Sequence, residues 1–246
     1  MQANSSDPQQ AAWARGPASR WLPRLCEVCQ AWDRTPVCAR CRVRFALARP
    51  RCPQCALPSP GGAVCGACLG APPPWSSCVA AVDYGFPWDR LITRFKFGQR
   101  PDLAVPLAAL LAQALAAAPI GRATVVTAVP LSPARLAERG FNQAWQLARR
   151  IARALRLPAH AELLLRCRDT PHQVGLDRAQ RERNLRQALL AAPERGATIA
   201  GRDIALVDDV MTTGMTARAA TLALRDAGAA SVQVWVVART LPDDDR

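Results

Sequence analysis

The sequence of 246 residues lacks an apolar run long enough to cross a membrane as a helix. Its longest apolar stretch, residues 103–120, consists largely of alanine and is interrupted by Pro106 and Pro119. The first 20 residues also lack the apolar segment of a secretory signal, because charged residues such as Asp7 and Arg15 lie among them. These absences predict a cytoplasmic protein that does not insert into membranes.

Lysine is nearly absent as well, since Lys96 is the only lysine among 32 basic residues and arginine supplies the other cations. With 19 acidic residues, the formal net charge is +13. A planar guanidinium donates two parallel hydrogen bonds to a phosphate, so this composition suits phosphorylated ligands or nucleic acid. A GC-rich codon usage explains the same bias, and the charge alone does not decide between the two interpretations.

Cysteine, by contrast, is abundant, and eight of the ten cysteines form four CxxC pairs between residues 26 and 68. Two residues between thiolates let both sulfur atoms face one metal ion, and two such pairs complete a tetrahedral zinc site. Disulfides belong to exported proteins, and repeated pairs in one short segment do not suit a redox dithiol, so we predict two structural Zn²⁺ sites. The first set is Cys26, Cys29, Cys38 and Cys41, and the second is Cys52, Cys55, Cys65 and Cys68. A pairing in which the two sets interleave stays open.

Changes in composition divide the chain into three parts. Residues 1–20 are rich in glutamine, alanine and serine without periodicity, which predicts a disordered N-terminal tail. Residues 21–71 hold the cysteine pairs among many prolines and glycines, which predicts a small double zinc ribbon that depends on its metal to fold. The stiff Ala-Pro-Pro-Pro segment at residues 71–74 is the expected boundary, and residues 75–246 form the remaining domain.

Beyond this boundary, short apolar runs alternate with amphipathic segments. The apolar runs predict strands at residues 79–84, 124–129, 204–207 and 232–237. The amphipathic segments predict helices at residues 88–97, 102–117, 142–155 and 216–227, with Asp102 as the N-cap of the second. Strands that alternate with helices are typical of an α/β fold with a mostly parallel sheet flanked by helices. Ligands of such sheets bind beyond the carboxyl ends of the strands.

The strand predicted at residues 204–207 leads into the motif with the clearest chemistry, VDDVMTTGMT at residues 207–216. A turn of hydroxyl groups and glycine before a helix presents backbone N–H groups, Thr hydroxyls and the positive helix end to one phosphate. Asp208 and Asp209 cannot bind the same anion, so they suit the neutral diol of an attached sugar. No GK[ST] or GxGxxG sequence occurs here, which excludes a Walker P-loop and a dinucleotide-binding turn. The alternative is a capped helix after a strand, with both carboxylates in solvent.

This motif resembles the phosphoribosyl pyrophosphate (PRPP) binding motif of the type I phosphoribosyltransferases. Further blocks along the chain are similar to the ComF/GntX family of competence-related proteins, in which a cysteine-rich double zinc ribbon precedes a transferase-like domain. These blocks are Lys96-Phe97, Val129-Pro130-Leu131, Arg135, Arg139-Gly140-Phe141-Asn142-Gln143, Thr170-Pro171-His172-Gln173-Val174-Gly175-Leu176, Arg181 and Asn184. The resemblance covers about residues 22–240 and departs from the family pattern at Ala128, Gln187 and Leu189. It implies a type I phosphoribosyltransferase-like sheet preceded by zinc ribbons.

The resemblance also implies a role for each residue of the site. Asp208 and Asp209 are the expected catalytic pair, which binds the ribose hydroxyls. The expected ligands of the 5′-phosphate are Thr212, Thr213, Gly214, Met215 and Thr216. The expected ligands of the pyrophosphate are Arg135, Arg139 and, as a further candidate, Lys96. Mg²⁺ bound with PRPP takes up the charge that the leaving pyrophosphate releases, so no Ser-His-Asp triad is needed.

The function that the resemblance implies is the transfer of phosphoribose to an unknown acceptor, in a protein linked to competence and DNA uptake. The alternative is a module that senses PRPP or binds single-stranded DNA without catalysis. For DNA, a run of arginines offers a basic helix face and three tryptophans offer stacking for bases, unless they pack against the metal sites. These residues are Arg149, Arg150, Arg153, Arg156, Trp21, Trp32 and Trp75. A helicase of the DNA-uptake machinery is a further candidate partner, and the oligomeric state stays open.

Overall fold

The computed structural model describes residues 23–167 and 188–242 of the chain. The predicted N-terminal tail, Trp21 and the family blocks between residues 170 and 184 lie outside these ranges. Within them, no helix is both long and apolar enough to cross a membrane.

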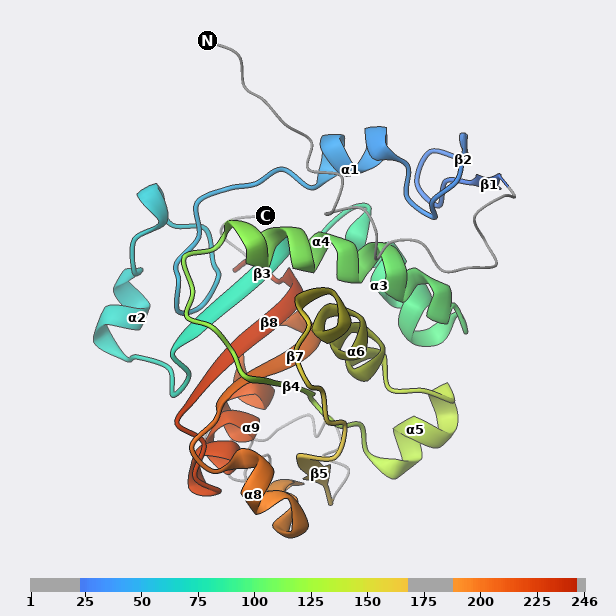
Figure 1. The fold of residues 1–246 in the computed structure, drawn as a ribbon. Coiled ribbons are helices and arrows are strands. Elements are labelled where there is room, and N and C mark those ends of the chain that lie inside the picture. Colours follow the sequence, from blue (N-terminus) through green and yellow to red (C-terminus); the bar gives the residue numbers. More distant parts are fainter. Residues whose placement is uncertain (1–22, 168–187, 243–246) are drawn as a thin grey trace, which may run out of the picture.

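A parallel sheet of four strands forms the centre of the described chain, with the strand order β3-β8-β7-β4 (Figure 1). Its strands are β3 (Ser77–Asp83), β8 (Ser231–Arg239), β7 (Asp203–Met211) and β4 (Val125–Ala128). In the register, Val207 of β7 lies opposite Trp235 of β8, and Ile204 of β7 lies opposite Val125 of β4. The central strands β7 and β8 are apolar along most of their length because both faces of the sheet are covered. The parallel sheet predicted from the sequence is confirmed.

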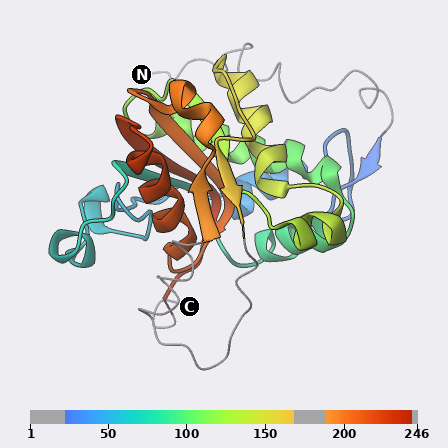
Figure 2. The same ribbon diagram turned by 90° about the horizontal axis from the view of Figure 1, so that it is seen from below.

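Helices cover both faces of this sheet, and each face has its own hydrophobic core (Figures 1 and 2). The first face packs against α3 (Trp88–Phe97), α4 (Ala104–Ala117) and α6 (Gln143–Leu155). The second face packs against α9 (Met215–Asp226), α8 (Gly196–Ile199) after the turn η4 (Pro193–Arg195), and the antiparallel pair β5 (Leu164–Arg166) and β6 (Leu189–Ala191). The alternation of side chains along β8 explains the two cores, since Trp235 belongs to the first and Val234 and Val236 belong to the second.

Strand β7 is longer than the sequence predicts. The prediction ended it at residue 207, where the apolar run stops, but the strand continues to Met211. The reason is its neighbour, because β8 runs beside it as far as Arg239, which lies opposite Met211. Asp208 and Asp209 therefore lie within the strand and not in the loop after it.

The prediction of Asp102 as a helix N-cap is wrong. Helix α4 begins at Ala104, after the 3₁₀ turn η3 (Pro101–Leu103), and its N-cap Leu103 makes no side-chain capping bond. The Asp102 carboxylate instead accepts hydrogen bonds from the Arg100 guanidinium at 2.8 and 2.9 Å. Asp102 belongs to an ion network and not to the helix end.

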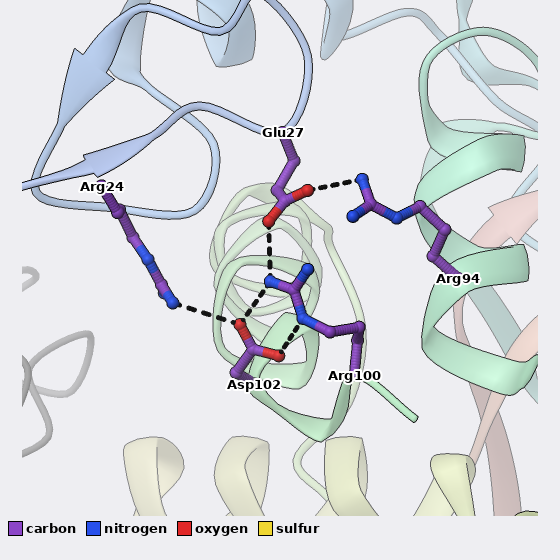
Figure 3. A network of polar contacts seen from close by, with 5 residues as sticks. All are labelled: Arg24, Glu27, Arg94, Arg100 and Asp102. Atoms are coloured by element: carbon purple, nitrogen blue, oxygen red, sulfur yellow. Dashed lines mark hydrogen bonds and ion pairs between the residues drawn. The ribbon is translucent and has the colours of Figure 1, made fainter. Parts of the chain in front are cut away.

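This network joins the first zinc-ribbon segment to the α/β part of the chain (Figure 3). Glu27, in the first ribbon, accepts hydrogen bonds from Arg94 of α3 and from Arg100, the latter at 2.7 Å. Arg24, also in the ribbon, pairs with Asp102 at 3.4 Å. The charges of two basic side chains thus compensate the Glu27 carboxylate, whose side chain is only 12% exposed.

Both ribbon segments pack directly on the α/β part. The first contains β1 (Arg24–Leu25), β2 (Trp32–Asp33) and α1 (Ala39–Phe45), and the second contains the turn η2 (Pro60–Gly62) and α2 (Gly66–Gly70). In the first, Cys26 belongs to the same buried cluster as Leu107 of α4, and Trp88 Nε1 donates to the Phe45 carbonyl at 2.9 Å. In the second, the Pro53 carbonyl accepts a hydrogen bond from the Cys78 backbone N–H of β3 at 2.7 Å. The domain boundary at residues 71–74 stays a prediction, but it does not separate two independent cores.

Candidate functional site

The eight paired cysteines form two compact groups. In each group the four sulfur atoms lie within 4.8 Å of one another. Each group combines a turn, which carries one CxxC pair, with the start of a short helix, which carries the other. Cys38 is the N-cap of α1, where its side chain accepts the Cys41 N–H, and Cys65 is the N-cap of α2 without such a bond. The grouping is the predicted one, Cys26, Cys29, Cys38 and Cys41 in one site and Cys52, Cys55, Cys65 and Cys68 in the other, and the interleaved arrangement is excluded.

The protonation of these thiols fits a bound cation. Burial raises the pKa of Cys26, but backbone N–H donors, led by that of Cys38, outweigh it and lower the pKa to about 7. Cys52 follows the same pattern, with a pKa lowered to about 7 by the N–H of Cys65 and its neighbours. Burial and the neighbouring sulfurs raise the pKa of Cys41 and Cys68, since no second negative charge is tolerated nearby without a cation. Four crowded thiols without a competing histidine suit tetrahedral Zn²⁺.

The acidic pair on β7 is the centre of the second candidate site. Asp209 is 3% exposed, and its Oδ2 atom lies 3.0 Å from Nζ of Lys96, near the end of α3. Asp208 is half-buried, and its carboxylate accepts the backbone N–H of Asp209 at 2.8 Å. Burial and then the charge of Asp209 raise the pKa of Asp208 to about 8, against a smaller opposite effect of Lys96. The chain thus holds one buried, ion-paired carboxylate beside one that resists ionisation.

The loop after β7 has the geometry of an anion site. Thr212 and Thr213 are exposed, and Gly214 is the N-cap of α9 with a φ of 78°. The left-handed φ favours glycine, and a Cβ atom at Gly214 would also press on the Trp75 ring at 3.3 Å and displace the flexible Met211 Cε, which lies at 2.8 Å. Gly214 has no side chain to cap α9, and the Met215 N–H makes only a long hydrogen bond of 3.5 Å to Thr213 Oγ1, so a phosphate could approach this helix end.

The predicted pyrophosphate ligands lie on α5 (Pro133–Arg139) and at the end of α3. The Arg139 guanidinium stacks on the Phe97 ring, 4.6 Å from its centroid, and its Nε atom is buried without a hydrogen-bond partner. Arg135 is half-buried one turn earlier on α5. Lys96, a further candidate for pyrophosphate, instead pairs with Asp209, next to the Phe97 that supports Arg139. The end of α3 therefore contacts both Asp209 of the acidic pair, through Lys96, and Arg139 of α5, through Phe97.

Asn142, in the RGFNQ block, has a structural role at the start of α6. Its side-chain amide donates to the Val129 carbonyl at 3.0 Å, and its Oδ1 atom accepts the backbone N–H of Trp145 at 3.2 Å. One side chain thus fixes the end of the β4 segment and caps α6. Gly140, with a φ of 76°, ends α5 in the left-handed conformation.

Sequence reasoning missed Arg239, the last residue of β8. It is 7% exposed and donates hydrogen bonds to four backbone carbonyls. The acceptors are Cys55 at 2.9 Å, Met211 at 2.9 Å, Thr240 at 2.9 Å, and Thr212. The available signal was an arginine at the end of an otherwise apolar strand, at the same edge of the sheet as Asp208.

The residues predicted for DNA binding differ in their exposure. Trp32 is 71% exposed, and Arg153 and Arg156 are exposed at the end of α6. Arg149 and Arg150 both donate to the side-chain oxygen of Gln146 on the same helix. For Trp75 the alternative of packing near the metal site applies, because Trp75 is 7% exposed and packs between the second zinc ribbon and the Gly214 loop before α9.

A cleft of about 810 Å³ lies at the opposite, amino-terminal end of the strands, between the second ribbon, β3 and the end of α4. Its arginines include Arg49 and Arg51, which both pair with Asp83, at 3.2 and 2.8 Å. One carboxylate compensates only one of these two charges, and Arg122 adds a further cation to the lining. Ligands of parallel sheets, however, bind at the carboxyl ends of the strands, which favours the loop before α9 as the ligand site.

Known proteins share both parts of this architecture. A family model described as a double zinc ribbon domain matches residues 19–69. DNA utilization protein YhgH of Salmonella typhimurium is 39% identical over 235 residues, which cover 92% of this chain and 98% of that protein. The chain belongs to the ComF/GntX family. Competence protein F of Haemophilus influenzae, another relative of this ComF/GntX protein, is 35% identical over 71% of this chain and 78% of its own.

Solved structures show a partial similarity to the ComF/GntX chain. Glutamine PRPP amidotransferase from B. subtilis, complexed with ADP and GMP, covers 58% of this chain and 30% of its own, with 25% identity and a TM-score of 0.41. The protein TT1426 from Thermus thermophilus covers 56% of this chain and 83% of its own, with 22% identity and a TM-score of 0.33. The described chain has the expected parallel sheet flanked by helices and preceded by a double zinc ribbon.

Proposed function

We propose that this protein binds Mg-PRPP at the carboxyl end of its sheet and transfers phosphoribose to an acceptor, in the use or uptake of DNA. The observation that carries the proposal is the buried Asp209 carboxylate, paired with Lys96 a few residues before the uncapped N-terminus of α9. Such a site offers acceptors for sugar hydroxyls and donors for a phosphate side by side. The DNA part of the proposal is supported by the relatives named for DNA utilization and competence.

In this proposal each group has one task. The carboxyl oxygens of Asp208 and Asp209 accept hydrogen bonds from the ribose hydroxyls, and Lys96, 3.0 Å from Asp209 Oδ2, orients the Asp209 side chain. The N–H groups and hydroxyls of residues 212–216 bind the 5′-phosphate. Arg135 and Arg139 bind the pyrophosphate, and their guanidinium groups stay charged as it leaves. Mg²⁺, when bound with PRPP, supplies further positive charge to the diphosphate.

The chemical step requires no nucleophile from the protein. The acceptor attacks C1 of the ribose while the bond from C1 to the pyrophosphate oxygen breaks, and the electron pair leaves with the pyrophosphate. Charge develops on the ribose ring and on the leaving group, so fixed charges at both ends stabilise the transition state. Arg139 suits this role because its stacking on Phe97 orients the guanidinium before the ligand arrives.

Calorimetry with Mg-PRPP tests the binding. Asp209→Asn should weaken the affinity at least about tenfold, or about 1.4 kcal/mol, because a buried carboxylate that accepts a hydroxyl makes a charge-assisted hydrogen bond. Asp226→Asn, at the exposed far end of α9, is the matched control and should bind like the wild type. An unchanged affinity of Asp209→Asn would refute the assignment.

Pyrophosphate release tests the transfer. The zinc-loaded protein is incubated with Mg-PRPP and a panel of bases, amines and single-stranded DNA. We expect release with at least one acceptor class, and its loss when Asp208 and Asp209 are both changed to Asn. Binding without release for any acceptor would favour a PRPP-sensing module over an enzyme.

Direct binding of single-stranded DNA is the second candidate function, which the exposed Trp32, Arg153 and Arg156 support. Affinity for an oligonucleotide of about 30 nucleotides should be measurable at about 50 mM salt and should fall steeply as salt rises. Reversal of Arg149, Arg150 and Arg153 to Glu should abolish it. If the triple variant binds DNA as well as the wild type does, this function is refuted.

A further inference from the structure

The loop that would hold the phosphate is linked to the second zinc ribbon by the buried side chain of Arg239. Arg239 donates from Nε to the Cys55 carbonyl at 2.9 Å, and from Nη1 to the carbonyls of Met211, at 2.9 Å, and Thr212. Cys55 is one of the four sulfur ligands of the second site. One guanidinium therefore spans the metal-binding turn and the backbone immediately before Gly214.

Trp75 forms a second link between the same two segments. Its indole Nε1 donates to the Gln54 carbonyl, the residue before Cys55, at 2.5 Å. Its ring lies 3.3 Å from the position of a Cβ atom on Gly214. Gln54 and Cys55 of one turn are thus joined to both ends of the 211–214 segment, through two buried side chains that are each 7% exposed.

The position of the Cys55 carbonyl makes this link depend on the metal. Four sulfur atoms held around one Zn²⁺ fix the turn that carries Gln54 and Cys55. Without zinc this turn loses that constraint, and the two carbonyls to which Trp75 and Arg239 donate lose their fixed positions.

We infer that Arg239 and Trp75 are positioning residues that transmit the metal state of the second zinc ribbon to the phosphate loop, residues 212–216. Loss of zinc from the Cys52, Cys55, Cys65 and Cys68 site loosens this loop and weakens phosphate binding. Loss of zinc from the first site leaves the loop unchanged, because the first ribbon contacts α3 and α4 instead. The ligand part of this inference rests on the proposed PRPP function, whereas the loop part does not.

Hydrogen–deuterium exchange of the full-length, zinc-loaded protein tests the loop part without any ligand. Cys65→Ser and Arg239→Met should each raise amide exchange in residues 212–216 at least about tenfold. The matched controls are Cys29→Ser, in the first site, and Arg225→Met, an exposed arginine of α9 that also donates to a carbonyl, that of Pro74. Both controls should leave exchange in the loop as in the wild type. Wild-type exchange in a Cys65→Ser protein that has lost one zinc would overturn the inference.

A double variant separates a shared path from two independent effects. If zinc acts through Arg239, then Cys65→Ser combined with Arg239→Met should raise loop exchange no further than either change alone. If the exchange rate of the double variant rises by the product of the two single increases, the role of Arg239 is overturned. If Cys65→Ser unfolds the protein, Arg239→Lys serves as the second variant. Lysine keeps the charge but lacks the branched guanidinium that donates to both segments, so this change should still loosen the loop.

Calorimetry with Mg-PRPP on the same proteins separates this inference from the proposed function. If the wild type and Cys29→Ser bind Mg-PRPP at least about tenfold more tightly than Cys65→Ser does, the result supports both the proposed function and the coupling to zinc. Equal binding by wild type and Cys65→Ser supports the PRPP site and overturns the coupling. If no variant binds PRPP while loop exchange still follows zinc, the proposed function fails and the coupling stands.

Discussion

Asp208 should make the protein less stable as the pH rises, and Asp208→Asn should remove that dependence. Burial and the charge of Asp209 raise the pKa of Asp208 from 3.8 to about 8 in the folded protein. Between these values the folded chain holds a proton that the unfolded chain has released, so the free energy of unfolding falls as pH increases. The contribution of Asp208 is complete below about pH 4 and is lost as pH passes about 8.

The magnitude follows from the size of the shift. One pKa unit corresponds to about 1.4 kcal/mol, so a shift of about 4 units sets an upper limit near 6 kcal/mol. Asp208 is only half-buried and shares Lys96 with Asp209, so we expect about 2–3 kcal/mol at pH 9. For a chain of this size that is a change in Tm of about 4–10 °C.

Thermal unfolding by circular dichroism, without Mg²⁺ or PRPP, measures this effect at about pH 5, 7 and 9. Asn keeps the shape of the side chain and carries no charge. The Tm of Asp208→Asn should therefore exceed that of the wild type at pH 9 and approach it at pH 5. Asp226→Asn, an exposed carboxylate on α9, should follow the wild type at every pH. Equal pH slopes for Asp208→Asn and the wild type would refute the reasoning.

Three further predictions concern the loop at residues 212–216, helix α5 and the metal sites. Gly214→Ala should cost about 1–3 kcal/mol of stability, because it combines a left-handed φ with a close contact to the Trp75 ring, and urea unfolding measures it; a cost below about 0.5 kcal/mol would contradict the geometry. Arg139→Ala should lower the calorimetric affinity for pyrophosphate and preserve that for ribose 5-phosphate; equal losses would contradict its assignment to one end of the ligand. Elemental analysis should give two zinc ions per chain, and a value of one or none in freshly purified protein would contradict the two sites.

Local sequence patterns predicted those parts of the protein that depend on local geometry. The CxxC spacing determined which thiols share a site, because each pair is brought together by one turn. The apolar runs located all four strands of the sheet, since buried parallel strands are apolar along their length. The extension of β7 to Met211 escaped prediction because it depends on pairing with Arg239 and its neighbours on another strand.

Contacts between distant segments escaped prediction for the same reason. Arg239 meets Cys55 across 184 residues, and nothing near either residue indicates the other. Lys96 was assigned to the ligand because it is a cation in a family block, whereas in the structure it lies on Asp209, which the fold alone brings near. The sequence named candidate site residues, whose roles stay a prediction, but it did not indicate the contacts that hold them.

The hydrogen bond from Trp88 to the Phe45 carbonyl sets a limit on how the chain can be shortened. A truncated protein beginning at residue 75 would keep every strand of the sheet but lose Phe45, leaving a buried indole N–H without its acceptor at a cost of about 1–3 kcal/mol. It would also uncover the side of the α3 and α4 cluster on which Cys26 and Val37 now pack. Such a fragment would expose an apolar face and aggregate, so a shortened protein for screening or crystallisation has to retain the ribbons.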